Sequence, residues 1–251
     1  RLYHTVNLLL HLANTLLVFA FLRSLVQATG IALVAAALFA VHPLQVEAVA
    51  WVSGRSILLS SLFYLGAMIT YLAYMRSGRV HHLAGVWVLF VLAILAKTSA
   101  ATLPLALWAI DLYSRRKDVR RVLAEKVPFL AVSGVFGCIA LVARSGVSHV
   151  QDFAVRYPPA QRVCIVAYSV LWYPAKLLYP AGLAAFHPFP ASADGWLPWT
   201  FYAAPIVLVG LGLVVWFGRS SRVLVFGSLF LLACLVLVVQ VVPISELMVC
   251  D

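Results

Sequence analysis

The chain has 251 residues, of which 64% are hydrophobic and 10% are charged, and its formal net charge is +10 at pH 7. Its mean hydropathy of +1.02 excludes a soluble globular domain, which would need far more polar side chains to cover its surface. The basic residues lie in short segments between apolar runs, where membrane topology places them, so a nucleic-acid partner is also excluded.

The fold class predicted from these runs is all-α, a polytopic helical bundle in the membrane. No run alternates with the period of two that a membrane barrel requires. Eight apolar runs are predicted to be spans, and a ninth, residues 163–180, is predicted to be a re-entrant or interfacial helix. We treat residues 1–251 as one transmembrane domain. The eight predicted spans are residues 6–24, 31–43, 56–75, 84–97, 99–113, 127–144, 201–217 and 222–242.

The first span carries four polar residues at steps of three and four, namely His4, Asn7, His11 and Asn14. This spacing places them on one face of a helix. Polar side chains on one stripe of a membrane helix usually form hydrogen bonds with a neighbouring helix, and we predict this role here. His4 and His11 are about 10 Å apart at 1.5 Å per residue, so one metal ion does not reach both without further ligands.

Residues 42–55 interrupt the apolar runs with ionisable side chains, namely His42, Glu47 and Arg55. Pro43 is expected to end a helix and Gly54 to permit a turn. Charges at the rim of a membrane are candidates for a functional site because they are costly in lipid. Two structural alternatives stand beside this hypothesis: the charges only face water, or Glu47 and Arg55 form an ion pair.

Residues 84–97 and 99–113 are both short for a span of about 20 residues. Their ends therefore need burial by neighbours or extension by the flanking residues. Lys97, between them, is either a rim residue that extends toward water or a cation that faces a ligand. Asp111 is predicted to pair with Arg115, one helical turn later.

The most basic segment, residues 114–126, is predicted to be cytoplasmic together with residues 218–222. An even number of crossings separates two segments on the same side, and the spans at 127–144 and 201–217 supply them. Residues 163–180 therefore do not cross, and we predict that they lie at the outer surface. Their aromatic residues suit a belt at the headgroup level, namely Tyr168, Trp172, Tyr173 and Tyr179.

Mixed charges gather on the predicted outer side, which places a site there. The acidic residues on this side are Glu47, Asp152, Asp194, Glu246 and Asp251, and the basic ones include Arg55, Lys97, Arg156, Arg162 and Lys176. The four cysteines, Cys138, Cys164, Cys234 and Cys250, form no CxxC pair. We therefore predict neither a disulfide framework nor a metal site built on them.

Residues 39–55, Phe-Ala-Val-His-Pro-Leu-Gln-Val-Glu-Ala-Val-Ala-Trp-Val-Ser-Gly-Arg, resemble the membrane half of a glycosyltransferase family. This family is the transmembrane and tetratricopeptide-repeat O-mannosyltransferases with their bacterial relatives, of the integral-membrane C-type glycosyltransferase fold. The resemblance covers essentially the whole chain. Weaker matching strings follow in order: residues 95–98, 103–104, 111–113, 172–174, 178–183, 186–188 and 243–251.

The resemblance implies transfer of a sugar, mannose in the named family, from a polyprenyl-phosphate carrier to a protein or other hydroxyl acceptor on the extracytoplasmic side. It also implies a multi-pass protein of a bacterial inner membrane, or of the endoplasmic reticulum in a eukaryote. Such enzymes carry an acidic motif in the first outer loop and C-terminal tetratricopeptide repeats, which this chain lacks. The chain is therefore expected to be a membrane-domain fragment, inactive alone, with the catalytic acid upstream of Arg1.

The implied chemistry needs a carboxylate to accept the acceptor's proton, cations to stabilise the departing phosphate and a groove for the lipid. The candidate substrate-binding residues are His42, Glu47, Arg55, Lys97, Arg156, Arg162 and His187. We expect Arg55 and Lys97 to bind the phosphate, with Arg156 and Arg162 as weaker candidates. Glu47 has three alternatives: to position the acceptor, to bind a divalent cation or to hold Arg55. The two histidines are expected to hydrogen-bond the sugar or the phosphate.

Two other classes of function are open at this point. A transporter or lipid flippase is favoured by the short pair of helices around Lys97, whereas the absence of a repeat of residues 42–55 argues against it. A non-catalytic membrane scaffold is the third hypothesis, since the expected acidic motif is missing.

Overall fold

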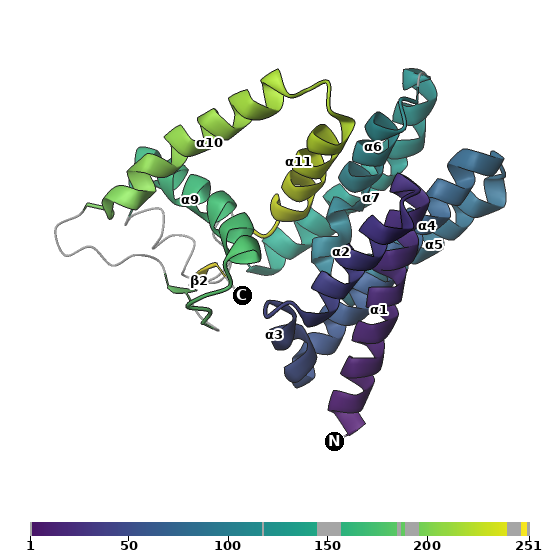
Figure 1. Ribbon diagram of the computed structural model, residues 1–251, viewed down its shortest axis with the longest axis horizontal. Coiled ribbons are helices and arrows are strands. Elements are labelled where there is room, and N and C mark those ends of the chain that lie inside the picture. Colours follow the sequence, from purple (N-terminus) through teal and green to yellow (C-terminus); the bar gives the residue numbers. More distant parts are fainter. Residues whose placement is uncertain are drawn as a thin grey trace. The chain divides into compact units, whose positions relative to one another are not determined.

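The chain is helical throughout except for one short pair of strands in the computed structural model (Figure 1), which describes residues 2–116, 118–144, 157–184, 187–188, 196–239 and 247–249. The predicted all-α class is therefore confirmed. The α-helices are α1 (Leu2–Val26), α2 (Thr29–Val41), α3 (Gln45–Ala50), α4 (Arg55–Ser77), α5 (Val80–Ala96), α6 (Leu103–Tyr113), α7 (Val119–Arg144), α9 (Pro159–Leu178), α10 (Trp199–Phe217) and α11 (Arg222–Leu235). Two 3-10 helices, η1 (Val52–Gly54) and η2 (Thr98–Thr102), precede α4 and α6.

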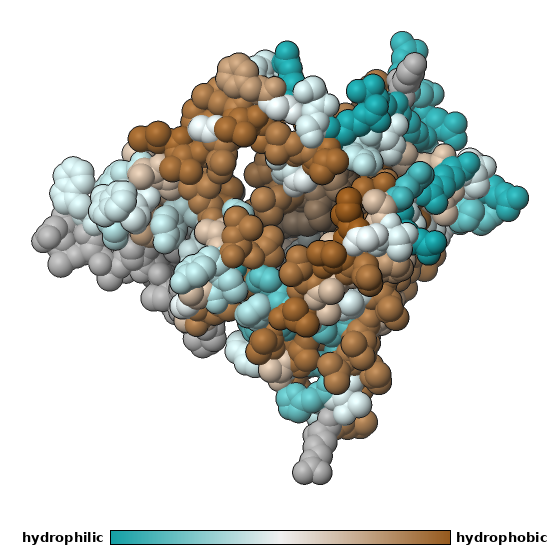
Figure 2. Space-filling model, in the orientation of Figure 1, coloured by the Kyte–Doolittle hydropathy of each residue, from teal (hydrophilic) through white to brown (hydrophobic). Residues whose placement is uncertain are grey.

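Among the residues that the structure describes, four helices are long and apolar enough to cross a membrane. They are α1, η1 with α4, α7 and α10. Shorter apolar helices are α2, α5 and α11. Large apolar side chains stay exposed along these helices, as the brown surface in Figure 2 shows. Such a surface is stable in lipid, which covers apolar faces directly. The prediction of a helical membrane protein is confirmed, and the predicted count of eight spans stays a prediction.

The chain forms two compact units, residues 1–103 with 129–136 (unit 1) and residues 104–128 with 137–251 (unit 2). In unit 1, α1 packs against α2 and α4, and α4 packs against α5. The fully buried side chains of this unit include Met68, Tyr71 and Phe90. Trp87 of α5 stacks on Phe129, with ring centroids 3.9 Å apart, so aromatic packing ties the middle of α7 into unit 1.

The ends of α2 and α4 follow from local sequence. His42 has an extended backbone (φ −67°, ψ 131°), as expected of a residue before proline, and α2 ends at Val41. Gly78 adopts the left-handed conformation (φ 68°) and donates its N–H to the Tyr74 carbonyl oxygen at 2.8 Å. This is the usual glycine termination of a helix. It lets the chain reverse so that α5 returns along α4.

In unit 2, α9 packs against α10. Tyr168 of α9 stacks on Phe201 of α10 at 4.2 Å between ring centroids. A buried cluster surrounds this contact: Tyr157, Ile165, Trp172, Leu197 and Phe201. Two of the aromatic residues predicted for the headgroup belt, Tyr168 and Trp172, thus pack against protein. The interfacial position of α9 itself stays a prediction.

Strand β1 (His187–Pro188) pairs antiparallel with β2 (Leu247–Val249) in unit 2. Helices throughout were predicted, so this pairing is a difference from the expectation. The strands are too short to show the alternating pattern by which a strand is recognised in a sequence. A second difference concerns residues 99–113, where η2 precedes α6 in place of one continuous α-helix.

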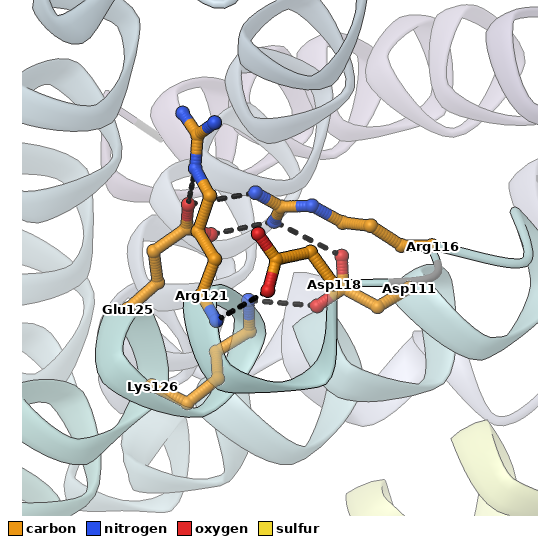
Figure 3. A network of polar contacts seen from close by, with 6 residues as sticks. All are labelled: Asp111, Arg116, Asp118, Arg121, Glu125 and Lys126. Atoms are coloured by element: carbon orange, nitrogen blue, oxygen red, sulfur yellow. Dashed lines mark hydrogen bonds and ion pairs between the residues drawn. The ribbon is translucent and has the colours of Figure 1, made fainter.

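A network of charged side chains joins α6 to α7 inside unit 2 (Figure 3). Lys126 Nζ lies 2.8 Å from Asp111 Oδ2, and both side chains are at most 5% exposed. Arg116 lies 3.6 Å from Asp111 and binds both oxygens of Glu125, at 2.5 and 2.7 Å. The predicted pair of Asp111 with Arg115 is wrong, because α6 ends at Tyr113 and Arg115 takes a positive φ of 52°.

Candidate functional site

The break between α2 and α4 is a tight series of turns. The Nδ1 atom of His42 accepts a hydrogen bond from the N–H of Leu44 at 3.2 Å. The carbonyl oxygen of His42 accepts one from the N–H of Gln45 at 2.9 Å. Trp51 then donates its N–H to the Glu47 carbonyl oxygen at 3.0 Å, which closes α3. His42 is half-buried, and its ring contributes to the turn.

Helix α1 hydrogen-bonds to this break and its flanking helices through Asn7, His11 and Asn14 of its polar stripe. Asn7 Nδ2 donates to the carbonyl oxygens of Val49 at 3.2 Å and Trp51 at 2.8 Å. Asn14 Nδ2 donates to the Leu58 carbonyl oxygen at 2.9 Å. These are carbonyls at the end of α3 and in the first turn of α4. Val49 lies in the last turn of α3, where carbonyls have no intrahelical donor, and Asn7 supplies one.

The third member of the stripe, His11, acts at the end of α2. Its Nε2 atom lies 3.0 Å from the Ala40 carbonyl oxygen, and its ring stacks on Phe39 with centroids 5.4 Å apart. His11 is buried, whereas His4 is exposed. The predicted hydrogen bonds to a neighbouring segment are therefore confirmed for three of the four polar residues of α1.

Gly54 is required by close packing of η1 on α3. A Cβ atom added there would lie 2.2 Å from the carbonyl oxygen of Ala48, a backbone atom. Its φ of −62° suits any residue, so the requirement comes from space and not from backbone conformation. The predicted turn at Gly54 is confirmed, and its physical reason is contact with α3.

We expect Gly54→Ala to destabilise the protein by about 1–3 kcal/mol, because the new methyl group forces α3 and η1 apart. Thermal unfolding in detergent measures the loss. Gly30→Ala is the matched control, since Gly30 has open space around its Cβ position. We expect that control to keep or slightly raise the melting temperature. Equal melting temperatures for the two variants would contradict the packing of η1 against α3.

Arg55 begins α4 with its guanidinium close to the N-terminal end of α1. Its Cζ atom lies 5.1 Å from the ring centroid of Tyr3, a cation–π contact. The side chain is half-buried, and its Nε atom is buried without a hydrogen-bond acceptor. Among the residues that the structure describes, no carboxylate oxygen lies within 4.0 Å of Arg55. The structural ion pair with Glu47 is therefore not formed.

Lys97 lies at the same end of the α4–α5 pair as Arg55. The register of the two helices is set by Ser60, whose hydroxyl donates to the Ala93 carbonyl oxygen at 3.0 Å. Ser60 follows Arg55 by five residues, and Ala93 precedes Lys97 by four. Because the helices are antiparallel, both cations come to one end of unit 1. Lys97 is exposed and extended (φ −156°, ψ 128°), between α5 and η2.

The opposite end of unit 1 holds a different set of basic residues. Arg76, near the end of α4, donates to the Ser24 carbonyl oxygen, near the end of α1. Arg23 and Arg79 are exposed at the two turns on this side. The grouping agrees with the predicted topology, which separates these arginines from Arg55 and Lys97.

Glu47 lies in α3, a helix that packs against α1, α2 and α4. It is half-buried, in contrast to the exposed Lys97. Figure 1 shows α3 at the end of unit 1 where α1 begins. The structure therefore brings four predicted site residues to one end of one unit: His42, Glu47, Arg55 and Lys97.

The remaining candidates belong to unit 2 or lie outside the described residues. Arg162, in the first turn of α9, donates its Nε hydrogen to the Tyr157 carbonyl oxygen at 2.7 Å. This contact anchors the start of the helix. His187 lies in strand β1, opposite Val249 of β2. Arg156 lies outside the described residues.

In the part of the chain that the structure describes, the candidate donors do not form a metal centre. Within the described parts of the chain, no group of three or more His, Cys, Asp or Glu side chains lies close enough to hold an ion. The arrangement instead offers cationic donors at the end of an apolar bundle, which suits a phosphate carried on a lipid.

The chain is similar to three named protein O-mannosyl-transferases. It is 38% identical over 133 residues to Tmtc1 of Drosophila melanogaster, which is 53% of this chain and 15% of that protein. It is 46% identical over 77 residues to Tmtc2 of the same fly (31% and 8%) and 41% identical over 70 residues to human TMTC1 (28% and 8%). The chain thus matches a small part of each relative's length. No family model and no solved structure matches it.

Proposed function

From the homology of this chain to the TMTC protein O-mannosyl-transferases, we propose that it is part of a membrane glycosyltransferase. The proposed reaction moves a sugar from a polyprenyl-phosphate carrier to a hydroxyl group of a protein or glycan on the extracytoplasmic side. The proposed setting is a multi-pass protein of a bacterial inner membrane or of the endoplasmic reticulum. Its helices that are long and apolar enough to span a bilayer support this setting.

The observation that supports the proposal best is the placement of Arg55 and Lys97 at one end of the α4–α5 pair. Two cations at the end of apolar helices suit a phosphate at the membrane surface, with the polyprenyl tail in lipid. Arg55 is the stronger candidate, because its Nε is buried without an acceptor and no described carboxylate neutralises it. The planar guanidinium of arginine can donate hydrogen bonds to two phosphate oxygens at once.

In the proposed step, the acceptor oxygen attacks the anomeric carbon of the sugar while the bond from that carbon to the phosphate oxygen breaks. The phosphate leaves with the bonding electrons, and Arg55 and Lys97 stabilise its added charge. A carboxylate takes the proton of the acceptor hydroxyl. The resemblance assigns this carboxylate to an acidic motif upstream of Arg1, and Glu47 is proposed to position the acceptor.

The other candidates have weaker support. His42 lies at the same end of unit 1, and its half-buried ring is proposed to hydrogen-bond the sugar or phosphate. Arg162 donates its Nε hydrogen to the Tyr157 carbonyl oxygen, so its guanidinium already has a structural contact. Arg156 and His187 rest on the resemblance alone.

The test is sugar transfer by the full-length protein in lipid vesicles. The donor is a polyprenyl phosphate that carries radiolabelled mannose, and the acceptor is a peptide rich in serine and threonine. We expect label on the peptide only when the donor is phosphate-linked and the protein is intact. Accumulation of label inside the vesicles without transfer would instead favour a transporter or flippase. If label is neither transferred to the peptide nor accumulated in the vesicles, that result would favour the scaffold hypothesis.

A further inference from the structure

The acidic side chains at the turn between α6 and α7 have internal partners (Figure 3). The six charged residues there are Asp111, Arg116, Asp118, Arg121, Glu125 and Lys126. The buried Asp111 and the half-buried Glu125 are balanced by Arg116 and Lys126. Asp118 is exposed and accepts the N–H of Arg121 at 3.1 Å, which caps the start of α7. The network therefore adds no net charge to this end of unit 2.

Four arginines beside this network stay exposed. They are Arg115 and Arg120 at the α6–α7 turn, and Arg219 and Arg222 at the α10–α11 turn. Within the described ranges of the chain, none of the four has a carboxylate oxygen within 4.0 Å. Their positive charge is thus available to an anion from outside the chain.

A ring contact brings the two turns to the same end of unit 2. Tyr113, the last residue of α6, lies 5.3 Å from Phe226 of α11 between ring centroids. Arg115 follows Tyr113 by two residues, and Arg222 precedes Phe226 by one helical turn. The arginines of both turns therefore flank one aromatic contact.

The end of α10 has the character of a membrane interface. Trp216 and Phe217 are 61% and 80% exposed. The guanidinium of Arg219 lies over the Trp216 ring, 4.5 Å from its centroid. A tryptophan paired with a cation at the end of an apolar helix is the arrangement expected at the level of lipid headgroups.

We propose that the α6–α7 and α10–α11 turns together bind the phosphate of an anionic phospholipid. Four exposed arginines supply the charge, and the exposed aromatic residues of α10 lie beside the acyl chains. Figure 2 shows hydrophilic residues where α6 meets α7 and brown, apolar residues along α10. Arginine suits this role because its planar fork binds phosphate oxygens in pairs. The site is separate from the one proposed for the sugar carrier and does not depend on it.

The test measures lipid bound to the full chain by native mass spectrometry. Phosphatidylglycerol is the anionic probe, and phosphatidylcholine is the comparison. We expect preferential binding of phosphatidylglycerol that weakens about fivefold for each arginine removed, in Arg115→Gln with Arg120→Gln and in Arg219→Gln with Arg222→Gln. Raising the salt concentration should weaken it further, because these charges are exposed.

The matched control removes the same charge elsewhere, by Arg23→Gln with Arg79→Gln, both exposed in unit 1. We expect this control to bind phosphatidylglycerol as the parent protein does. Equal losses in the control and in the test variants would show diffuse attraction and overturn the proposal. It would also be overturned if the parent protein bound both lipids equally. Inorganic phosphate should displace the lipid no more than another salt does at the same ionic strength, since the proposed ligand is a headgroup together with its acyl chains.

Discussion

Arg55→Ala is expected to lower sugar transfer at least about 100-fold, as does loss of one donor that stabilises a developing negative charge in other enzymes. Folding should change little, because Arg55 has no salt bridge to a described carboxylate and Tyr3 is exposed at 55%. An exposed cation–π contact contributes about 0.5–1 kcal/mol. The measurements are initial rates of mannose transfer from the polyprenyl-phosphate donor and thermal unfolding in the same detergent.

The kinetic pattern separates catalysis from carrier binding. Removing a cation that acts on the departing phosphate lowers kcat. Removing a cation that only holds the lipid raises KM. Glu47→Ala should also abolish transfer, since Glu47 is proposed to position the acceptor. Arg79→Ala is the matched control, an exposed arginine at the far end of α4, and should transfer sugar normally. Unfolding of both site variants would support a structural role for these residues.

Lys126→Met is expected to destabilise the protein by about 3–5 kcal/mol, because it leaves the buried Asp111 carboxylate without its closest cation. Lys126 Nζ lies 2.8 Å from that carboxylate, whereas Arg116 lies 3.6 Å away and is already shared with Glu125. Unfolding in detergent, by heat or denaturant, measures the change in stability.

The double variant Asp111→Leu with Lys126→Met should recover most of this loss, because it removes both buried charges together. Arg120→Met is the matched control on α7, where the side chain is exposed and forms no salt bridge with a described residue. We expect it to change stability by less than about 0.5 kcal/mol. Losses that add in the double variant would mean that the two residues do not stabilise each other.

Much of unit 1 was predictable because membrane helices are continuous apolar runs, and polar interruptions in them are costly. The interval of three and four residues in α1 identified the face on which Asn7, His11 and Asn14 meet their partners. The residues Pro43 and Gly54 marked the limits of the break. The partners themselves are backbone carbonyls, which leave no signal in a sequence.

The predicted partner of Asp111 was wrong for a geometric reason. A spacing of four residues predicts a pair only while the helix continues, and α6 ends two residues before Arg115. The true partners, Arg116 and Lys126, are brought close by the turn and by α7. A left-handed non-glycine residue such as Arg115 (φ 52°) is not predictable from its own side chain.

In the candidate site, too, the sequence predicted the placement of some residues but not their contacts. Topology from basic loops predicted that Arg55 and Lys97 share a side, and the register of α4 and α5 agrees. The contact of Arg55 with Tyr3 joins residues far apart in the chain, so periodicity gives no sign of it. The contact of Arg162 with the Tyr157 carbonyl oxygen at the start of α9 was likewise not predictable, because a backbone carbonyl leaves no signal in a sequence.

The hydrogen bonds of α1 to the break have a consequence for biogenesis. The acceptors at Ala40, Val49 and Leu58 are translated after α1 has already left the ribosome. Until they arrive, α1 alone would carry two amides and an imidazole into hydrocarbon, an unfavourable transfer. We therefore predict that α1 enters the lipid together with α2, α3 and α4, which supply these acceptors.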